Sequence, residues 1–236
     1  MKRVTPELCR RYERVNTLAT VNLVKQAISS GVKRFIFIST IKVLGDKNSS
    51  ENPFTHQSLL NPIGPYATSK ADSEKEIIRL CAGSEMEYVI LRPPLIYGDK
   101  PKGNLKTLEM LAGLPIPIPL GSLENLRSLI SIQNFFDVLT LCMEHPSAAN
   151  ETLLVCDSNS VSTSELLGEL RRKRSSKVKD FSVPSFVLKT ILHSLGLKSK
   201  FQKLTETMVI DSSRTQSLLS WSPRQFKIRE NERSRY

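Results

Sequence analysis

Apolar residues recur at helical spacing in the first part of the chain, between positions 12 and 30. The residues of this apolar stripe are Val15, Leu18, Ala19, Leu23, Val24, Ala27 and Ile28. Side chains three or four positions apart share one face of a helix, so the stripe predicts an amphipathic helix. Gly31 follows at once, and glycine is common just beyond a helix C-terminus because it tolerates left-handed backbone angles.

Two runs of continuous apolar residues predict strands that are buried on both faces. Residues 34–40 read RFIFIST, and residues 87–98 read EYVILRPPLIYG, in which two prolines close the strand. Such runs are typical of parallel sheets that helices cover on both sides. A polar loop at 45–65 and a second helical pattern at 66–82 lie between the two runs. The order helix, strand, loop, helix, strand predicts βαβ units and an α/β fold.

The pattern becomes more mixed after Gly98. The predicted elements are a helix at 102–113, a proline-rich extended segment at 114–122, a short strand at 127–133, a helix at 134–144, a buried strand at 151–157, a helix that begins near Ser162, and a helix at 184–196. The helix near Ser162 begins with a capping box, in which Ser162 or Thr163 is the N-cap and Glu165 follows close behind.

Positive charge exceeds negative charge along the chain, and the formal net charge is +11. Much of the excess lies in two clusters, at residues 171–179 and 224–235. A positive field suits an anionic ligand such as a nucleotide diphosphate, and it is equally typical of a solvated basic face. The basic runs carry no interleaved aromatic residues and no recognition-helix or zinc-finger signature, so we expect no nucleic-acid partner.

The cysteines and histidines form no recognisable ligand or disulfide pattern. Cys9, Cys81, Cys142 and Cys156 are scattered without a CxxC pair, which favours reduced thiols in a cytoplasmic protein. The three histidines lie far apart, and we expect no metal site. The first residues lack the apolar stretch of a signal peptide, and no segment reaches roughly 18 apolar residues, so we expect no membrane span.

The segment PYATSK places Tyr66 and Lys70 four residues apart on a predicted helix. Side chains at this spacing share a face, and an ammonium near a phenol lowers the phenol pKa. Such a tyrosine can exchange a proton with a substrate hydroxyl near neutral pH, although the same spacing also arises by chance on an exposed helix. Ser39 and Thr40 either simply end their strand or line a ligand site, because open parallel sheets bind ligands where strands end.

Three segments resemble the extended short-chain dehydrogenase/reductase family, in its NAD-dependent epimerase/dehydratase branch. They are GVKRFIFISTIKVLGD, PIGPYATSKADSEKEI and YVILRPPLIYGD, and the resemblance extends over residues 12–98 in order and spacing. In that family a Ser/Thr-x-x-Val-Tyr-Gly segment precedes YxxxK, and Arg-Pro-x-x-x-Tyr-Gly follows it. The chain is similar in particular to bacterial UDP-sugar 4-epimerases and 4-keto-sugar reductases of surface-polysaccharide synthesis, in which an Ile-Lys-Val segment follows the serines.

The resemblance implies roles for individual residues. The catalytic set is Thr40, which would bind the reacting sugar oxygen, Tyr66, the acid/base, and Lys70, which would bind the nicotinamide ribose and tune Tyr66. The cofactor-binding set is Asn16, Ser39, Tyr66, Lys70 and Pro94. The substrate-binding set is Thr40, Asn104 and Arg127, of which the last two match residues that hold the UDP diphosphate. Without the resemblance, Asn104 and Arg127 are equally well explained as ordinary surface residues.

The resemblance also implies an incomplete, doubly wound parallel sheet of the Rossmann type with a small C-terminal lobe. Residues 1–98 would form the truncated Rossmann-like core that carries the Thr/Tyr/Lys site. Residues 99–236 would form the substrate-binding lobe, with a strand near 152–157 that returns to the core. The tail near 226–236 has no apolar periodicity, and we expect it to be disordered.

The chain departs from the family pattern in its glycines. None of its ten glycines form the GxxGxxG loop that holds a dinucleotide pyrophosphate at a helix N-terminus, and the acidic residue for the adenosine ribose is also missing. In addition, Leu44 replaces the tyrosine of the Val-Tyr-Gly segment. We therefore expect an N-terminally truncated family member with impaired NAD binding.

The expected function is NAD(P)-dependent epimerase or reductase chemistry at C4 of a UDP-hexose, for surface-polysaccharide synthesis. The expected cofactor is NAD or NADP, the partner is a UDP-sugar substrate, and the resemblance allows a homodimer. One alternative is an inactive fragment or a binding-only remnant, which the missing glycine loop favours. Another is a Rossmann-like regulatory or RNA-binding relative, and the joint presence of Thr40, Tyr66 and Lys70 speaks against it.

Overall fold

The computed structural model describes residues 4–98, 104–120, 123–178, 180–183 and 205–227, and the side chain of Asn104 lies outside this description. The elements are α1 (Pro6–Tyr12), the π-helix η1 (Glu13–Leu18), α2 (Ala19–Ser29), β1 (Arg34–Ile38), the 3-10 helix η2 (Ile41–Val43), α3 (Pro65–Cys81), β2 (Glu87–Arg92), β3 (Leu95–Tyr97), α4 (Asn104–Ala112), β4 (Leu129–Ser131), α5 (Ile132–Glu144), the 3-10 helix η3 (Pro146–Ala148), β5 (Glu151–Leu154), α6 (Thr163–Lys173) and α9 (Ser213–Leu219). The helix predicted at 184–196 lies outside the described residues.

The central feature is a parallel sheet with the strand order β1-β2-β5. Arg34 pairs with Glu87 at the start of the β1–β2 ladder, and Leu91 pairs with Leu153 between β2 and β5. This arrangement confirms the predicted α/β fold with an incomplete parallel sheet. Within the described part of the chain, β1 forms one edge of the sheet and pairs only with β2.

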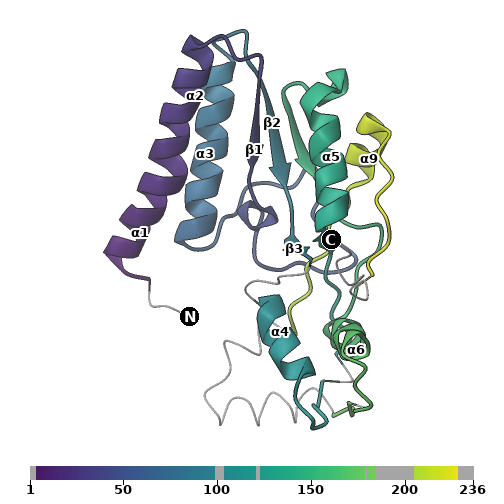
Figure 1. Ribbon diagram of the computed structural model, residues 1–236. Coiled ribbons are helices and arrows are strands. Elements are labelled where there is room, and N and C mark those ends of the chain that lie inside the picture. Colours follow the sequence, from purple (N-terminus) through teal and green to yellow (C-terminus); the bar gives the residue numbers. More distant parts are fainter. Residues whose placement is uncertain (1–3, 99–103, 121–122, 179, 184–204, 228–236) are drawn as a thin grey trace, which may run out of the picture.

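Helices cover both faces of this sheet (Figure 1). The first core cluster contains Val24 of α2, Ile77 of α3 and Ile90 of β2, so α2 and α3 cover one face. The second contains Phe135 and Val138 of α5, which pack with β2 and β5 on the other face. Because both faces of the central strand are covered, its sequence is continuously apolar rather than alternating.

The first predicted helix is part of a longer helical stretch than the apolar stripe indicated. It begins at Pro6, one residue after Thr5, whose hydroxyl accepts a hydrogen bond from the Leu8 N–H at 3.2 Å and caps the helix. The stripe is also only partly buried. Val24 is fully buried, whereas Leu18 and Leu23 remain more than half exposed. Helical spacing therefore identified the element but not the residues that pack on the sheet.

A second, smaller group of elements lies beyond the carboxyl ends of the core strands. Strands β3 and β4 pair in parallel, with Leu95 opposite Leu129. Beyond them α4 and α6 pack against each other through Leu105, Leu108, Leu166 and Leu170 (Figure 1). The capping box predicted for α6 is present, because the Glu165 N–H donates to Ser162 Oγ and the Ser162 N–H donates to Glu165 Oε2.

A buried polar network connects the two groups of elements. The Tyr97 hydroxyl donates to Asp157 Oδ2 at 2.6 Å, and Asn134 Nδ2 donates to Asp157 Oδ1 at 2.7 Å. Phe226 packs its ring on Tyr97, and the Lys227 N–H donates to the Tyr97 hydroxyl. The first two residues of the tail at 226–236 thus make specific contacts, and the residues from 228 onward lie outside the description.

Candidate functional site

The site is built where α3 begins, next to the carboxyl end of β1. Gly64 adopts φ +83°, a left-handed angle that glycine reaches without steric cost, and Pro65 follows at the first helical position. This turn places Tyr66 in the first turn of α3. On the opposite side, Thr40 follows the last strand residues and caps the short helix η2, where its hydroxyl accepts from the Lys42 N–H.

This arrangement brings the Thr40 side chain close enough to the Tyr66 phenol to influence its pKa, and both residues line one cavity. Burial raises the pKa of the Tyr66 phenol above its ordinary value, and the hydrogen bond from Thr40 opposes that rise. The ring of Tyr12 packs edge-on against the Tyr66 ring, with the centroids 5.7 Å apart. Because desolvation raises its pKa, the phenol is protonated near neutral pH and can act as a proton donor.

The Lys70 ammonium contacts β1, and no influence of its charge on the Tyr66 phenol is found, contrary to the expectation from the YxxxK spacing. Its ammonium donates to the backbone carbonyl of Ile38 at 2.8 Å and lies 4.4 Å from the centroid of the Phe37 ring. Burial lowers the pKa of Lys70, an effect that the carboxylate of Glu74 opposes. The predicted lowering of the Tyr66 pKa is therefore wrong for this structure, because desolvation outweighs an ammonium that is directed elsewhere.

Asn16 lies against the next turn of α3 rather than in the cavity at Tyr66. Its side-chain Nδ2 donates to Ser69 Oγ at 2.9 Å, and its backbone carbonyl oxygen accepts a hydrogen bond from Ser73 Oγ at 2.8 Å. Asn16 belongs to the π-helix η1, whose extra backbone residue per turn is a feature found frequently near functional sites. In this arrangement Asn16 fixes the position of α3, because Ser69 Oγ in turn donates to the Tyr66 carbonyl at 2.9 Å.

Ser39 has an unusual hydroxyl for a strand end. The residue is 4% exposed, and its Oγ has no hydrogen-bond partner among the described residues. Its backbone N–H is satisfied, since it donates to the Leu91 carbonyl. A buried hydroxyl without a partner is costly, which is the kind of group that a bound polar ligand would satisfy.

One cavity of about 520 Å³ is lined by Thr40 and Tyr66 of the predicted catalytic set and by Arg127 of the substrate-binding set, and Lys70 is not among its lining residues. Its lining residues are Thr40, Ile41, Lys42, Asp46, Tyr66, Pro94, Leu95, Ile96, Leu105, Leu108, Arg127, Ser128, Leu129, Thr163, Leu166, Glu206 and Met208. Thr40, Tyr66 and Pro94 come from the sheet end, whereas Arg127 comes from the segment that precedes β4. The volume falls in the range of ordinary small-molecule pockets.

Arg127 lies at the far side of this cavity from the sheet. Its backbone forms a reciprocal pair of hydrogen bonds with Val161, at 2.8 and 2.9 Å, so the position of the residue is fixed by the strand-like pairing. Burial lowers the pKa of its guanidinium, and the negative charge of Glu206 opposes this change. Asn104, the other predicted diphosphate ligand, begins α4, and its side chain is not described, but Leu105 and Leu108 of that helix line the cavity.

Three charged residues of the cavity were not predicted from the sequence. Lys42 and Asp46 form an ion pair at 2.9 Å and both line the cavity. Lys42 lies just before the segment expected to be loop and Asp46 lies within it, where no helical pattern would have identified them. Glu206 is a third, and it reaches the cavity from a segment that is distant in sequence from every motif.

The described residues form neither a candidate metal site nor a candidate membrane span. No group of three or more His, Cys, Asp or Glu side chains is arranged to hold a metal ion in the part of the chain that the structure describes. No helix among the described residues is long and apolar enough to cross a membrane.

The residues at the sheet end fit the nicotinamide half of a dinucleotide. Thr40, Tyr66 and Pro94 line one cavity, Ser39 with its unpaired hydroxyl directly precedes Thr40, and Lys70 provides a cation one helical turn after Tyr66. The described residues include no glycine-rich turn of the kind that holds a pyrophosphate. The fit is thus to one half of the cofactor.

Comparison with known proteins identifies the relatives of this chain. Residues 5–156 match the family described as the NAD dependent epimerase/dehydratase family. A UDP-glucose 4-epimerase from Vibrio cholerae is 42% identical over 215 residues, which cover 91% of this chain and 66% of that protein. The chain thus spans slightly less than two thirds of this relative.

Solved structures show the same fold. The crystal structure of UDP-glucose 4-epimerase from Thermotoga maritima with UDP-glucose matches with a TM-score of 0.71 and 21% identity, over 91% of this chain and 66% of that chain. The structure of dTDP-glucose 4,6-dehydratase from Bacillus anthracis in complex with NAD matches with a TM-score of 0.68 and 15% identity, over 89% and 63%. At these identities the structures establish the fold.

Proposed function

Because this chain belongs to the NAD dependent epimerase/dehydratase family, we propose that it carries the proton-transfer and sugar-nucleotide-binding part of a UDP-hexose 4-epimerase or 4-keto-sugar reductase. The observation that carries the proposal is the cavity that contains Thr40 and Tyr66 at one side and Arg127 at the other. An acid/base pair and a cation for phosphates within one cavity are what a sugar nucleotide requires.

Tyr66 is the proposed acid/base. As a protonated phenol it can donate its proton to the C4 oxygen when a keto group is reduced, and as a phenolate it can take the C4 hydroxyl proton in the reverse direction. Thr40 lies near the phenol and lines the same cavity, so its hydroxyl can hold the reacting oxygen beside Tyr66. Burial raises the pKa of the Tyr66 phenol, so the protonated form, which is the proton donor, predominates near neutral pH.

The sugar diphosphate is proposed to lie at Arg127. A guanidinium presents several donors in a fixed fork that matches phosphate oxygens, and a partly desolvated cation binds such oxygens more strongly than an exposed one does. Leu105, Leu108 and Leu166 provide the apolar part of the cavity wall. The side chain of Asn104 remains part of the proposal on the basis of the sequence.

The proposed cofactor is NAD, which would accept the hydride from the sugar C4 and return it. Ser39 and Pro94 would border its nicotinamide, and Lys70 would exchange its bond to Ile38 for a ribose hydroxyl. We propose that the chain alone binds this cofactor weakly, because its sequence has no glycine-rich pyrophosphate loop. A binding-only role is the second candidate, and the same feature of the sequence favours it.

The setting of the enzyme is also part of the proposal. Scattered cysteines support a cytoplasmic location, and the resemblance supports a role in surface-polysaccharide synthesis. The exposed apolar side chains of Val15, Leu18 and Leu23 on the first helical stretch support a homodimer.

The experiment is a chimera that joins this chain to the part of the Vibrio relative outside the aligned region. We expect the chimera to interconvert UDP-glucose and UDP-galactose, or UDP-N-acetylglucosamine and its 4-epimer, when NAD is supplied. Tyr66→Phe should abolish turnover, because the phenol that moves the proton is lost. Tyr88→Phe is the matched control, since Tyr88 lies in β2 outside the cavity.

The outcomes separate the two candidates. Turnover that depends on Tyr66 supports the enzyme. A folded chimera that binds NAD and UDP-sugar without turnover favours the binding-only role, and turnover that survives Tyr66→Phe contradicts the assignment of the acid/base.

A further inference from the structure

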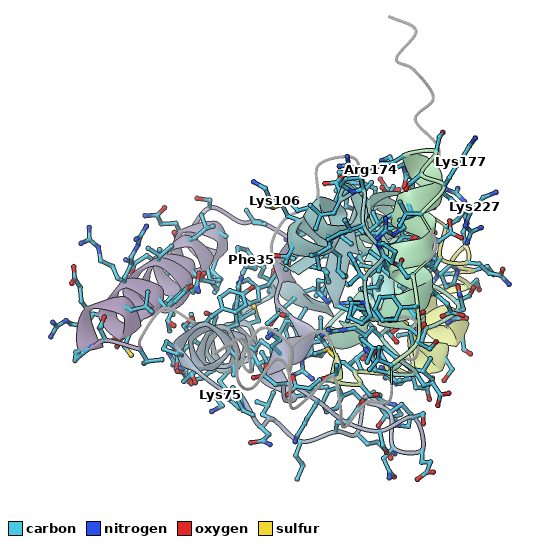
Figure 2. All side chains as sticks on the ribbon, turned by 90° about the horizontal axis from the view of Figure 1, so that it is seen from below. Phe35, Lys75, Lys106, Arg174, Lys177 and Lys227 are labelled. Atoms are coloured by element: carbon cyan, nitrogen blue, oxygen red, sulfur yellow. The ribbon has the colours of Figure 1, made fainter. Side chains whose placement is uncertain are left out.

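Four exposed cations lie on the α4–α6 pair and just beyond it. They are Lys106, near the start of α4, and Arg172, Arg174 and Lys177, at and just beyond the end of α6. Two of them also lie beside carboxylates, Arg172 beside Glu169 and Arg174 beside Glu109 at 3.8 Å. Figure 2 shows Lys106, Arg174 and Lys177 on one side of the molecule, with Lys75 of α3 on the opposite side. Arg174 lies against α4, since its Nη1 is 3.3 Å from the Cβ position that a side chain at Gly113 would occupy.

Four large apolar side chains are exposed in the same region. Met110, Leu114, Ile116 and Phe181 are between 41% and 66% exposed. They join the four cations in what we call the α4–α6 tip, which therefore consists of Lys106, Met110, Leu114, Ile116, Arg172, Arg174, Lys177 and Phe181. Large apolar side chains gathered at a basic surface are unusual for a face that meets only water.

The backbone under the tip is held firmly, so the apolar side chains are fixed in their outward positions. The buried guanidinium of Arg171 donates to the carbonyl oxygens of Leu114 and Ile116 at 3.2 and 2.9 Å. The same guanidinium forms an ion pair with Asp180 at 2.8 Å, directly before Phe181. Arg171 thus joins both apolar segments of the tip.

Helix stabilisation does not account for the tip. Cations in the last turn of a helix interact favourably with the partial negative charge of its carbonyl end, and this explains Arg171 to Lys173 on α6. It does not explain Lys177, which lies beyond the helix, nor the exposed aliphatic side chains of Leu114 and Ile116. The two features together need a partner that is both anionic and apolar.

We propose that the α4–α6 tip docks on an anionic phospholipid surface. The cations would contact lipid phosphates, while the apolar side chains insert at the level of the headgroups. Nucleic acid is the other polyanion to consider, but a single-strand site typically presents several aromatic side chains for base stacking, and among the apolar residues of the tip only Phe181 is aromatic.

The docked orientation has a consequence for the cavity. Leu105 and Leu108 of α4 and Leu166 of α6 line the cavity, and the same two helices carry residues of the tip. Docking through the tip would therefore place the cavity beside the membrane surface. This inference is independent of the proposed function, because it requires only the surface of the folded chain.

The experiment measures binding of the full chain to vesicles by sedimentation. The probes are phosphatidylcholine vesicles with and without about a third of phosphatidylglycerol, a fraction that gives an anionic surface. We expect binding only to the anionic vesicles, and we expect it to weaken as salt is added, because the ionic part is screened.

Charge and apolar variants test the two parts of the tip separately. Arg174→Glu/Lys177→Glu should weaken binding about 25-fold or more, since each cation near such a surface contributes about fivefold. Leu114→Ser/Ile116→Ser should weaken the binding that remains at high salt. Lys25→Glu/Lys75→Glu changes the charge equally on α2 and α3 and should leave binding unchanged. All six positions are exposed or largely exposed, and circular dichroism verifies that each variant is folded.

Three results would overturn the proposal. The first is equal binding to neutral and anionic vesicles, or no binding to either. The second is a charge variant of the tip that binds as the parent does, or a loss of equal size in the control. The third is binding to single-stranded RNA that depends on the same cations while vesicles are not bound, which would assign the tip to nucleic acid.

Discussion

Lys70 donates a hydrogen bond from Nζ to the carbonyl oxygen of Ile38 at 2.8 Å, and this bond ties the beginning of α3 to the end of β1. The ammonium also lies over the ring of Phe37. Its charge is therefore engaged by a backbone carbonyl and an aromatic face, and the phenol of Tyr66 depends on Thr40 instead. The two residues of the YxxxK motif thus act on different parts of the site in this structure.

The first prediction concerns the pKa of Tyr66. Thr40→Val should raise this pKa further, because it removes the hydrogen bond that opposes desolvation. Lys70→Met should change it much less. The measurement is the ultraviolet absorbance of the phenolate during an alkaline titration, with the Tyr66→Phe variant subtracted. A Tyr66 pKa that rises in Lys70→Met and not in Thr40→Val would contradict this assignment.

The same shift fixes the sign of a stability change. A phenol whose pKa is raised in the folded state contributes stability below its unfolded pKa, about 10, and loses it as pH rises through the folded pKa. The parent should therefore lose more stability than Tyr66→Phe between neutral and strongly alkaline pH. Thr68→Val is the control for Thr40→Val. Thr68 is exposed and lies on α3, the helix that carries Tyr66, so this substitution should leave the Tyr66 pKa unchanged.

The second prediction concerns the buried ion pair between α3 and β2. Arg92 donates to both oxygens of Glu74, at 3.1 and 2.6 Å, and both side chains are almost fully buried. Arg92→Leu should lower the free energy of unfolding by about 3–5 kcal/mol, because it leaves a buried carboxylate without its partner. Urea denaturation measures the change.

Two further variants make this prediction specific. Glu74→Leu/Arg92→Leu should recover much of the stability, since no charge is then buried alone. Glu76→Gln breaks an exposed pair on the same helix and should leave the denaturation midpoint unchanged. An Arg92→Leu variant as stable as the parent would show that this ion pair does not stabilise the folded chain.

The third prediction concerns Arg127 and the diphosphate. Arg127→Ala should weaken the binding of UDP by about tenfold or more, because a charge-assisted hydrogen bond to phosphate is lost. Isothermal titration with UDP measures the change. Arg79→Ala removes an exposed arginine on α3, far from the cavity lining, and should bind UDP as the parent does. Equal binding by the two variants would exclude Arg127 from the UDP site.

The fourth prediction concerns NAD and the chain alone. We expect no micromolar binding of NAD in isothermal titration, because contacts to the nicotinamide half must overcome an association cost estimated at about 4–15 kcal/mol. The chimera with the Vibrio relative is the positive control. Micromolar binding of NAD by the chain alone that is lost in Ser39→Val would contradict this prediction and would indicate that the chain binds its cofactor without a further segment.

The sequence by itself determined the type and order of the elements around the site. Continuous apolar runs predicted β1 and β2, and the structure pairs them in parallel. The helical pattern at 66–82 predicted α3, which the structure has at Pro65–Cys81 with Tyr66 in its first turn. These predictions succeed because the type of each element depends mainly on residues that are close together in the sequence, and their pattern can be recognised directly.

The tertiary structure alone decided how the side chains use this frame. The spacing of Tyr66 and Lys70 gave no sign that the ammonium would turn to the Ile38 carbonyl, since that bond depends on where β1 ends in space. Likewise, Glu206 reaches the cavity only because distant segments converge there. The packed fold decides where each side chain points, how far it is desolvated and which distant segments it contacts. For this reason the direction of the Tyr66 pKa shift could not be predicted from the motif.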